Sequence, residues 1–291
     1  MISKDILRKL KLIVFDLDGT LLREDGSIGP DSIALIKQLR ETGVYFSIAT
    51  GRLHSATTQF IGELGIDLPI ISLDGSLIKG GIDDTTIYES NVPVKYVKKA
   101  IHYADQYLLK IALCHAEAIY YTENNSVIPE LLEKFGATYD LVSSYDNILE
   151  NTLEIVIAGD YRDSIKHVEN RMIFPYSFGL QASSYKSHRH GGIYYLEIRK
   201  HGSSKGKGLQ RLSKHLKISV TETAVMGDWY NDKSLFESGG LKIAVQNAVP
   251  ELKNMADFVT KRTNNEDAVA EFLEMVLKSK QSDNADKRNK K

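Results

Sequence analysis

The chain has little cysteine, almost no net charge and no long apolar run. Its single cysteine, Cys114, excludes an internal disulfide framework and a cysteine zinc cluster, and it fits a reducing compartment. A formal net charge of -1 gives no electrostatic footprint for DNA or RNA. No apolar stretch approaches the roughly 20 residues that span a bilayer, and the first one, Leu12–Phe15, is too short for a signal peptide. These absences predict a cytoplasmic protein without a nucleic-acid or membrane partner.

The most informative stretch is residues 11–22, KLIVFDLDGTLL. Its apolar run Leu12–Phe15 predicts a buried strand, because it is too short for a helix and apolar on both faces. Asp16 and Asp18 follow at the carboxyl end, where open α/β sheets hold ligands. If the backbone stays extended, residues i and i+2 point the same way and both carboxylates address one small volume. Oxygen ligands on a turn suit Mg²⁺, although a strand that ends in an Asx-rich turn is an equally good interpretation of the motif alone.

Strands and helices alternate on either side of a central segment. With 291 residues, 42% of them hydrophobic, the chain has enough core for two domains. Strand–helix alternation predicts parallel strands joined by right-handed crossovers, so that the turns after the strands open on the same edge. The predicted strands cover 12–15, 44–49, 69–73, 223–226, 242–245 and 258–260, and the predicted helices cover 30–42, 230–237, 266–278 and a segment that starts near Lys205.

The central segment has a different character. Thirteen of the 15 tyrosines fall between Tyr88 and Tyr195. Helices at 94–108, 126–135 and 162–173 are interleaved with strands at 110–121, 152–158, 176–182 and 192–198, which predicts an α+β insertion. We therefore assign residues 1–83 and 197–280 to a discontinuous core domain and 84–196 to an inserted domain. Residues 281–291 are polar and charged, which predicts a disordered tail.

Three further polar groups lie at predicted element ends. Thr50 and Gly51 end a strand, where a hydroxyl and N–H groups suit phosphate oxygens, although Thr50 alone also fits a helix N-cap. Lys205 opens a helix, and its ammonium suits a phosphate unless it is simply solvated. The third group, which helix capping does not readily explain as a whole, is Asp228, Asn231 and Asp232.

In this order the motifs resemble those of the haloacid dehalogenase (HAD) superfamily of phosphotransferases. The resemblance is close to the Cof-type phosphatases, whose large α/β cap domain is inserted between the second and third motifs. It implies a Rossmann-like parallel-sheet core with an inserted cap, and it covers almost all of the chain apart from the interior of the insertion and the tail. The matching pieces are FDLDGTLL, ATGR, LEIRKHGSSKGKGL, MGDWYNDKSLFESGG, AVQNAV and VTKRTNNED.

The resemblance implies a role for each matching position. Asp16 is expected to be the nucleophile that forms an aspartyl-phosphate, and Asp18 to act as general acid and then as general base. Mg²⁺ is expected on the Asp16 carboxylate, the Asp18 backbone carbonyl and the Asp228 carboxylate, with Asp232 supporting these ligands from behind. The residues expected to bind the phosphate of the substrate are Thr50, Gly51, Lys205 and Asn231.

Some positions depart from the family pattern. Relatives usually show Asn-Gly-Ala where this chain has Asp74-Gly75-Ser76, and the extra carboxylate either alters substrate choice or caps a turn. Trp229 and Tyr230 replace smaller or polar residues, so they either stack on a substrate ring, narrow the entrance or pack beneath the cap. The loop His188-Arg189-His190 either reaches a second phosphate or a sugar, or is solvated. Its histidines lack the companions of a zinc site.

The sequence thus predicts a Mg²⁺-dependent phosphatase that hydrolyses a phosphomonoester of a small metabolite, with a sugar phosphate as the expected class. A sugar phosphomutase is one alternative, because sugar phosphomutases share the cap type. A non-catalytic sensor that binds a phosphosugar is another. Asp16 and Asp18 argue against the sensor, because binding alone does not need a nucleophile paired with an acid.

Overall fold

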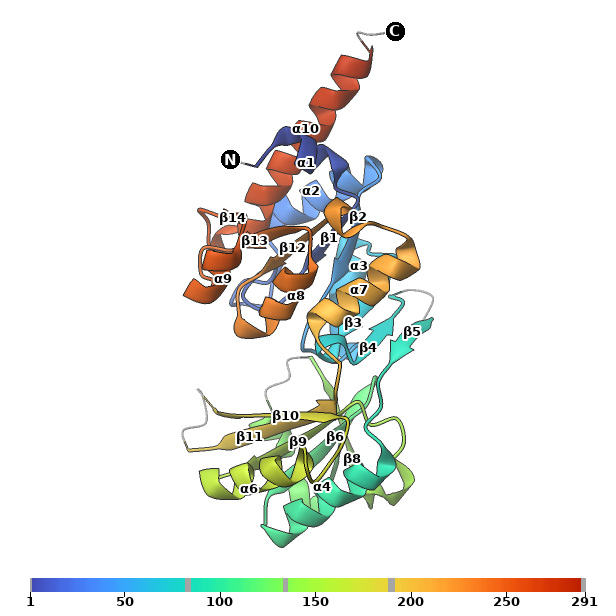
Figure 1. Ribbon diagram of the computed structural model, residues 1–291, viewed down its shortest axis with the longest axis vertical. Helices are drawn as coiled ribbons and strands as arrows, with labels where there is room; N and C mark the ends of the chain where they lie inside the picture. The colour runs from blue at the N-terminus through green and yellow to red at the C-terminus, as the bar shows by residue number, and fades with distance from the viewer. Residues whose placement is uncertain (1, 82–84, 133–135, 188–191, 289–291) are drawn as a thin grey trace. The chain divides into compact units, whose positions relative to one another are not determined.

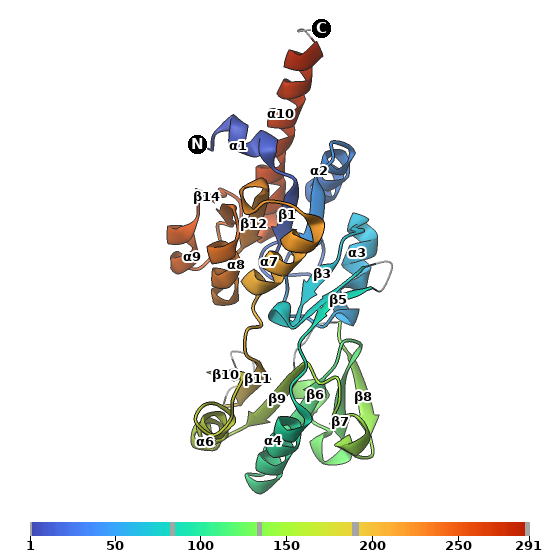
Figure 2. The ribbon, with the colours of Figure 1, turned by 45° about the vertical axis from the view of Figure 1, so that its right-hand side comes forward.

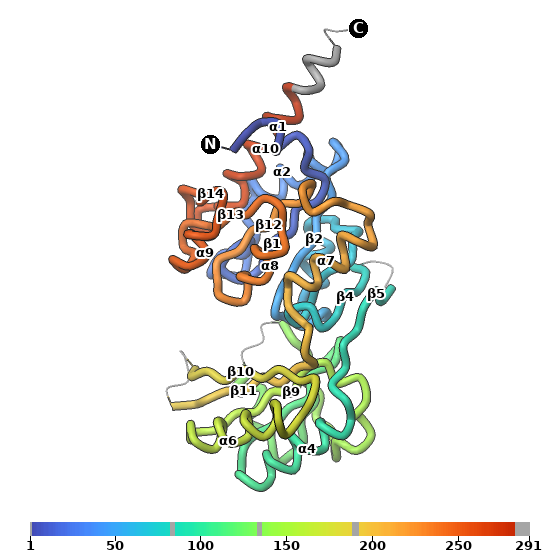
Figure 3. Tube along the Cα trace, in the orientation of Figure 1, coloured from blue at the N-terminus to red at the C-terminus, as the bar shows by residue number. Residues whose placement is uncertain are grey.

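The chain forms two compact units in the computed structural model, which describes residues 2–81, 85–132, 136–187 and 192–288. Unit 1 consists of Met1–Gly51, Gln59–Ile87 and Ser204–Lys291, and unit 2 consists of Arg52–Thr58 and Tyr88–Ser203. Figure 3 follows the chain through both units. The insertion expected at 84–196 lies almost wholly in unit 2. Residues 52–58 and 197–203, which we expected in the core domain, also belong to unit 2, where Ser55 N donates a hydrogen bond to Ala116 O.

Unit 1 is built on a five-stranded parallel sheet with the order β14-β13-β12-β1-β2 (Figure 1). Strand β1 lies in the middle and pairs with β12 on one side and β2 on the other. All four residues of β1 are wholly buried, so both faces of the strand are covered. The strands are β1 (Leu12–Phe15), β2 (Tyr45–Ile48), β12 (Thr223–Gly227), β13 (Leu241–Ala244) and β14 (Phe258–Val259).

Two groups of helices cover this sheet. Helix α7 (Lys205–Leu216) packs against α8 (Lys233–Ser238), whereas α10 (Ala268–Arg288) packs against α1 (Lys4–Lys9) and α2 (Pro30–Glu41). In Figure 1, α7 and α8 lie in front of the sheet and α2 lies behind it. Because both faces carry helices, the free positions for a ligand are the strand ends. The remaining helices that contribute to unit 1 are α3 (Thr58–Leu64) and α9 (Pro250–Met255).

A small antiparallel sheet extends the edge beside β2. Strand β3 (Ile70–Ser72) lies parallel to β2 through a single bridge between Ala49 and Ile71. It also pairs antiparallel with β4 (Leu77–Lys79), which is followed by β5 (Thr86–Glu89). Since β1, β2 and β3 all run parallel, their carboxyl ends lie on one edge of unit 1, and the residues that follow them come together there.

Unit 2 contains a six-stranded sheet with the order β10-β11-β9-β6-β7-β8. Helices α4 (Val94–Gln106) and α6 (Arg162–Met172) cover one of its faces, as Figure 2 shows. Apolar side chains of both helices, such as Val97 and Val168, pack there against Ile111, Ile155 and Leu196 of the strands. The other elements are α5 (Ile128–Leu131), β6 (Lys110–Cys114), β7 (Ala118–Thr122), β8 (Thr138–Val142), β9 (Glu154–Gly159), β10 (Leu180–Lys186) and β11 (Tyr194–Lys200).

The predicted fold class, a parallel α/β core with an inserted α+β unit, is confirmed, but three boundaries differ. Strand β10 begins at Leu180 rather than at 176, because Tyr176 N and Ser177 N both bond back to Ile173 O in a turn. The helix expected at 230–237 opens with a 3₁₀ turn, Tyr230–Asp232. Residues 281–288, expected to be disordered, continue α10.

Contacts with α1 explain why composition did not reveal the length of α10. Arg8 Nη2 donates to Ser282 Oγ at 3.1 Å, and Lys280 Nζ donates to Arg8 O at 3.0 Å. These bonds join residues more than 270 positions apart, so no local sequence pattern predicts them. Among the described residues, no helix combines the length and the apolar composition needed to cross a membrane.

Candidate active site

The turn after β1 separates the surroundings of Asp16 and Asp18. Asp16 N still bonds to Met226 O of β12 at 3.0 Å, but the chain then folds back, with Leu22 N bonding to Leu17 O at 2.9 Å. Asp16 is buried and Asp18 is exposed. The two carboxylates thus differ in exposure, and the expectation that both address one small volume stays a prediction, with the role of Asp18 resting on the family resemblance.

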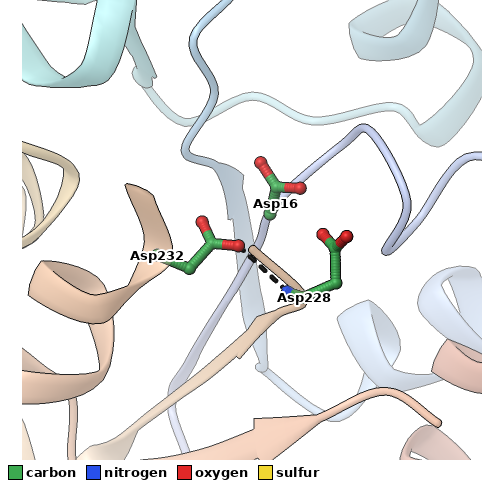
Figure 4. A group of neighbouring side chains, drawn as sticks. All are labelled: Asp16, Asp228 and Asp232. Atoms are coloured by element: carbon green, nitrogen blue, oxygen red, sulfur yellow. Dashed lines mark hydrogen bonds between the residues drawn. The ribbon is translucent and has the colours of Figure 1, made fainter. Parts of the chain in front are cut away.

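A cluster of three buried carboxylates occupies the strand ends. Oxygen atoms of Asp16, Asp228 and Asp232 lie within 4.8 Å of one another. Figure 4 shows how they meet: Asp16 follows β1, Asp228 follows the neighbouring strand β12, and Asp232 lies in the 3₁₀ turn after it. Because β1 and β12 are parallel and in register from Leu12–Thr223 to Phe15–Met226, the residues just beyond them share one edge.

A fully buried ammonium group links two of these carboxylates. Lys205 is the first residue of α7, which the side chain of Ser204 caps by accepting from Lys207 N. Lys205 Nζ lies 2.5 Å from Asp16 Oδ1 and 2.6 Å from Asp232 Oδ1. Burial acts to lower the pKa of Lys205, but the charges of Asp16, Asp232 and Asp74 outweigh it and raise the pKa. Lys205 is therefore a permanent cation in this site.

Both oxygens of Asp232 are engaged within the protein. Oδ1 accepts from Lys205, and Oδ2 accepts from the backbone N–H groups of Asp228 at 3.0 Å and Trp229 at 3.1 Å. Such a carboxylate orients the groups around it rather than reaching outward. This arrangement agrees with a supporting role for Asp232 behind the metal ligands.

The other two carboxylates have the character of cation ligands. Burial, followed by the charge of Asp232, raises the pKa of Asp16 well above its usual range, although Lys205 opposes this shift. Burial and Asp232 also raise the pKa of Asp228 to about 6, against the opposing hydrogen bond from Thr20. When all three carboxylates are ionised, three negative charges face the one positive charge of Lys205. A hard divalent cation such as Mg²⁺, held by Asp16 and Asp228, fits this donor set.

The turn after β1 is held by hydrogen bonds to segments far away in the sequence. Thr20 Oγ1 donates to Asp228 Oδ1 at 2.9 Å, and Asn247 Nδ2 donates to Gly19 O at 2.7 Å. Gly19 has a φ of +80°, and a Cβ added there would lie 2.4 Å from Asp228 Oδ2. Asn247 was not among the residues predicted to belong to the site. Its presence in the matching piece AVQNAV was the only available signal.

The residues predicted to bind phosphate lie around the same edge. Asp74 N donates to Thr50 O at 2.9 Å, and Asn231 Nδ2 donates to Asp74 Oδ1 at 3.2 Å. A Cβ added to Gly51 would lie 3.5 Å from Asp74 Oδ1. The structure thus brings Thr50, Gly51 and Asn231 together around Asp74, while Lys205 lies against Asp16.

Two of the unusual positions remain open to solvent. The side chains of Trp229 and Tyr230 form an edge-on pair with ring centroids 5.3 Å apart, and the residues are 51% and 56% exposed. This exposure does not support a role in the core of unit 1. The loop His188-Arg189-His190 lies outside the described residues.

Comparison with known proteins assigns the chain to a family. A model of the haloacid dehalogenase-like hydrolases matches residues 13–273. The chain belongs to this family. The match takes in β1, β12 and α7, and so every residue of the site described above.

Relatives of named activity are phosphatases. The chain is 26% identical over 275 residues to the 5-amino-6-(5-phospho-D-ribitylamino)uracil phosphatase YitU of Bacillus subtilis. The aligned region covers 90% of this chain and 96% of that relative. The chain is 27% identical over 276 residues to the HMP-PP phosphatase of Serratia proteamaculans, with 92% and 96% covered. The predicted family and enzyme class, a HAD-type phosphoric monoester hydrolase, are confirmed.

Solved structures agree on the fold. A haloacid dehalogenase-like hydrolase from Bacteroides thetaiotaomicron superposes with a TM-score of 0.80 at 24% identity, covering 92% of this chain and 99% of that one. At this identity the likeness shows the fold alone, and the assignment of site residues depends on the geometry of this chain.

Replacing Lys205 tests the buried ion pairs. We expect Lys205→Met to lower the free energy of unfolding by about 3–5 kcal/mol at pH 8 in EDTA, because Asp16 and Asp232 lose their counter-charge. The deficit should shrink toward pH 5, as the buried carboxyl groups take up protons. The free energy of unfolding is measured by urea denaturation, with the fluorescence of the single tryptophan, Trp229, reporting on unit 1. The control is Lys233→Met, whose 2.7 Å pair with Glu251 is exposed, and it should change little. Equal losses in the two variants would contradict the structural role of Lys205.

The raised pKa of Asp228 predicts a pH dependence that Mg²⁺ removes. The folded protein holds the proton of Asp228 up to a pKa of about 6, against a usual value of 3.8. Stability is therefore greatest below the lower value and falls as the pH rises through the higher one. Relative to Asp228→Asn, wild type in EDTA should lose about 2 kcal/mol between pH 4 and pH 7, because part of the difference is already lost at pH 4. Millimolar Mg²⁺ should restore most of the lost free energy of unfolding at pH 7, and it should add little at pH 4. A pH-independent difference, or equal stabilisation of both proteins by Mg²⁺, would contradict the assignment.

Proposed function

We propose that this chain is a Mg²⁺-dependent phosphatase that hydrolyses a phosphomonoester of a small metabolite through an aspartyl-phosphate, with a sugar phosphate as the expected class. The observation that carries the proposal is the buried carboxylate of Asp16, held 2.5 Å from the ammonium of Lys205 and beside Asp228 at the strand ends. The name of the relative YitU, whose substrate carries its phosphate on a ribityl chain, supports the substrate class.

The reaction divides into two displacements at phosphorus. In the first, a carboxylate oxygen of Asp16 attacks the phosphorus, the bond to the ester oxygen breaks, and Asp18 donates a proton to the departing alkoxide. In the second, Asp18 as a carboxylate takes a proton from a water molecule whose oxygen attacks the same phosphorus. The bond to Asp16 then breaks and inorganic phosphate leaves. The exposure of Asp18 suits a group that exchanges protons twice in each cycle.

Four residues position the phosphoryl group. Their hydrogen-bond donors come from three segments of the chain. These donors are the hydroxyl of Thr50, the backbone N–H of Gly51, the ammonium of Lys205 and the amide of Asn231. Asp232 keeps Lys205 in place through its 2.6 Å contact. Mg²⁺, held by Asp16, Asp228 and the backbone carbonyl of Asp18, would neutralise charge on the phosphoryl oxygens.

The alternatives differ in the fate of the phosphate. A phosphomutase returns the phosphoryl group to its substrate, so inorganic phosphate does not accumulate. A sensor binds a phosphosugar without turnover. The named activities of both relatives favour net hydrolysis over either alternative.

Phosphate release across a substrate panel tests the function. We expect wild type with Mg²⁺ to release inorganic phosphate from one or more members of a panel of sugar phosphates, nucleotides, and flavin and pyridoxal phosphates. Asp16→Asn keeps the shape of the nucleophile and removes its charge, so the rate should fall by about 10³-fold or more. EDTA should abolish the wild-type activity. Isomerised sugar phosphates without free phosphate would establish the mutase instead, and silence of wild type across the panel with retained binding would establish the sensor.

Asp18→Asn separates the two displacements. With p-nitrophenyl phosphate, whose leaving group needs little protonation, Asp16 should still be phosphorylated, whereas hydrolysis of the intermediate lacks its base. Intact-protein mass spectrometry should show one added phosphoryl group on Asp18→Asn after quenching, and none on the double variant Asp16→Asn/Asp18→Asn. If the single variant stays unmodified and turns over as wild type does, Asp18 is not the acid and base.

A further inference from the structure

One carboxylate at the active edge, Asp74, has no part in the proposed mechanism. It lies in the turn Leu73–Gly75 after β3, where three successive residues have positive φ: 45° for Leu73, 48° for Asp74 and 87° for Gly75. Positive φ is unfavourable for residues other than glycine, and such strain is concentrated at functional sites. The surroundings enforce it. Asp74 N donates to Thr50 O, and Gly75 approaches Ser204 so closely that a Cβ would lie 2.2 Å from Ser204 O.

The carboxylate of Asp74 contacts a residue outside its own turn. The turn is closed by a backbone bond of 3.1 Å from Ser76 N to Leu73 O. Asp74 Oδ1 instead reaches across the edge and accepts from Asn231 Nδ2 at 3.2 Å. The strained backbone therefore presents the side chain to residues on other elements.

The neighbours of Asp74 are the residues assigned to phosphate binding. It bonds to Thr50 through its backbone and to Asn231 through its side chain. A Cβ added to Gly51 would lie 3.5 Å from Oδ1 and 3.6 Å from Oδ2. The charge of Asp74 also contributes to the raised pKa of Lys205, so its field reaches the ammonium. The charge of Asp74 thus lies near all four donors, in addition to the charges of Asp16 and Asp232 that Lys205 contacts.

A negative charge in this position opposes the binding of an anion. Thr50, Gly51 and Asn231 are neutral donors and Lys205 is a cation, so each of them attracts a phosphoryl group, whereas Asp74 repels it. We propose that Asp74 is a specificity-determining residue that lowers the affinity of the site for inorganic phosphate, so that tight binding requires contacts made by the leaving group. This inference rests on the proposed function, because it presumes that these residues hold the phosphoryl group.

The consequence for substrate choice follows from hydrogen bonding. An ionised carboxylate only accepts hydrogen bonds. A leaving group with a hydroxyl close to the phosphoester offsets the repulsion by donating to Asp74, and the product phosphate, left without that group, is expelled. Polyhydroxylated substrates such as sugar phosphates meet this requirement. A phosphate ester without a donor does not.

Asp74→Asn tests the charge while preserving the fold. Asparagine tolerates positive φ as well as aspartate does, and its amide oxygen still accepts from Asn231. With Mg²⁺ present, we expect the dissociation constant of inorganic phosphate, measured by calorimetry, to fall about tenfold, and KM for p-nitrophenyl phosphate, which lacks a hydroxyl, to fall similarly. The ratio of the dissociation constants of phosphate for wild type and Asp74→Asn should approach one as salt is raised from 0.05 to 0.5 M, because dissolved ions screen the charge of Asp74.

The control is Asp67→Asn. Asp67 precedes β3, at the opposite edge of the sheet from Asp74, and its pair with Arg40 is exposed, so the same change in net charge should leave phosphate binding unaltered. Equal or weaker phosphate binding by Asp74→Asn, or a tenfold gain that salt does not reduce, would overturn the inference while wild type still releases phosphate. If wild type neither binds phosphate nor releases it from any ester, the proposed function fails instead.

Discussion

The site depends on one buried ammonium between two buried carboxylates. Asp16 follows β1, Asp232 follows β12 and Lys205 begins α7, and the contacts of 2.5 and 2.6 Å tie these three elements to one point. Two carboxylates alone would repel each other by about 4 kcal/mol at 4 Å in a medium of effective dielectric 20. The cost of burying Lys205 is offset because both partners accept from it and because Asp232 Oδ2 is satisfied separately by Asp228 N and Trp229 N. The proposed nucleophile, the proposed cation site and the loop that carries Asp228 are thus positioned by the same contact.

The sequence predicted the parts of this site that local patterns determine. The apolar run Leu12–Phe15 marked β1 to the residue, and parallel strands required Asp16 and Asp228 to share an edge. Features set by distant contacts escaped the analysis. Asn247 reaches Gly19 across 228 residues, and the length of α10 depends on bonds to α1. The full burial of Lys205 also lay beyond sequence reasoning, because it requires α7 to approach α8 so closely that a Cβ on Gly206 would lie 2.0 Å from Ser234 O.

An excess of negative charge makes the site suited to a cation. Among the described residues, Lys205 is the cation that acts on the three carboxylates of Asp16, Asp228 and Asp232, and burial keeps water from compensating the difference. Burial and Asp232 raise the pKa of Asp228 to about 6, so below that pH the protein without a metal ion relieves part of the excess charge by holding a proton. A divalent cation relieves it without a proton and leaves Asp16 ionised, which is the state that a nucleophile requires. The arrangement therefore couples metal binding to readiness for catalysis.

The same surplus of charge bears on product release. A site that bound the phosphoryl group through Lys205, Asn231 and Mg²⁺ alone would hold inorganic phosphate as firmly as the substrate, since these contacts are common to both. Interactions that do not distinguish substrate from product cannot raise turnover once the product has to leave. In the role proposed for it, Asp74, fixed in a strained turn beside Thr50 and Gly51, subtracts from this shared part of the binding energy. Discrimination then falls to the leaving group, which only the substrate carries, and a carboxylate among the phosphate-binding residues becomes an understandable feature of a phosphatase.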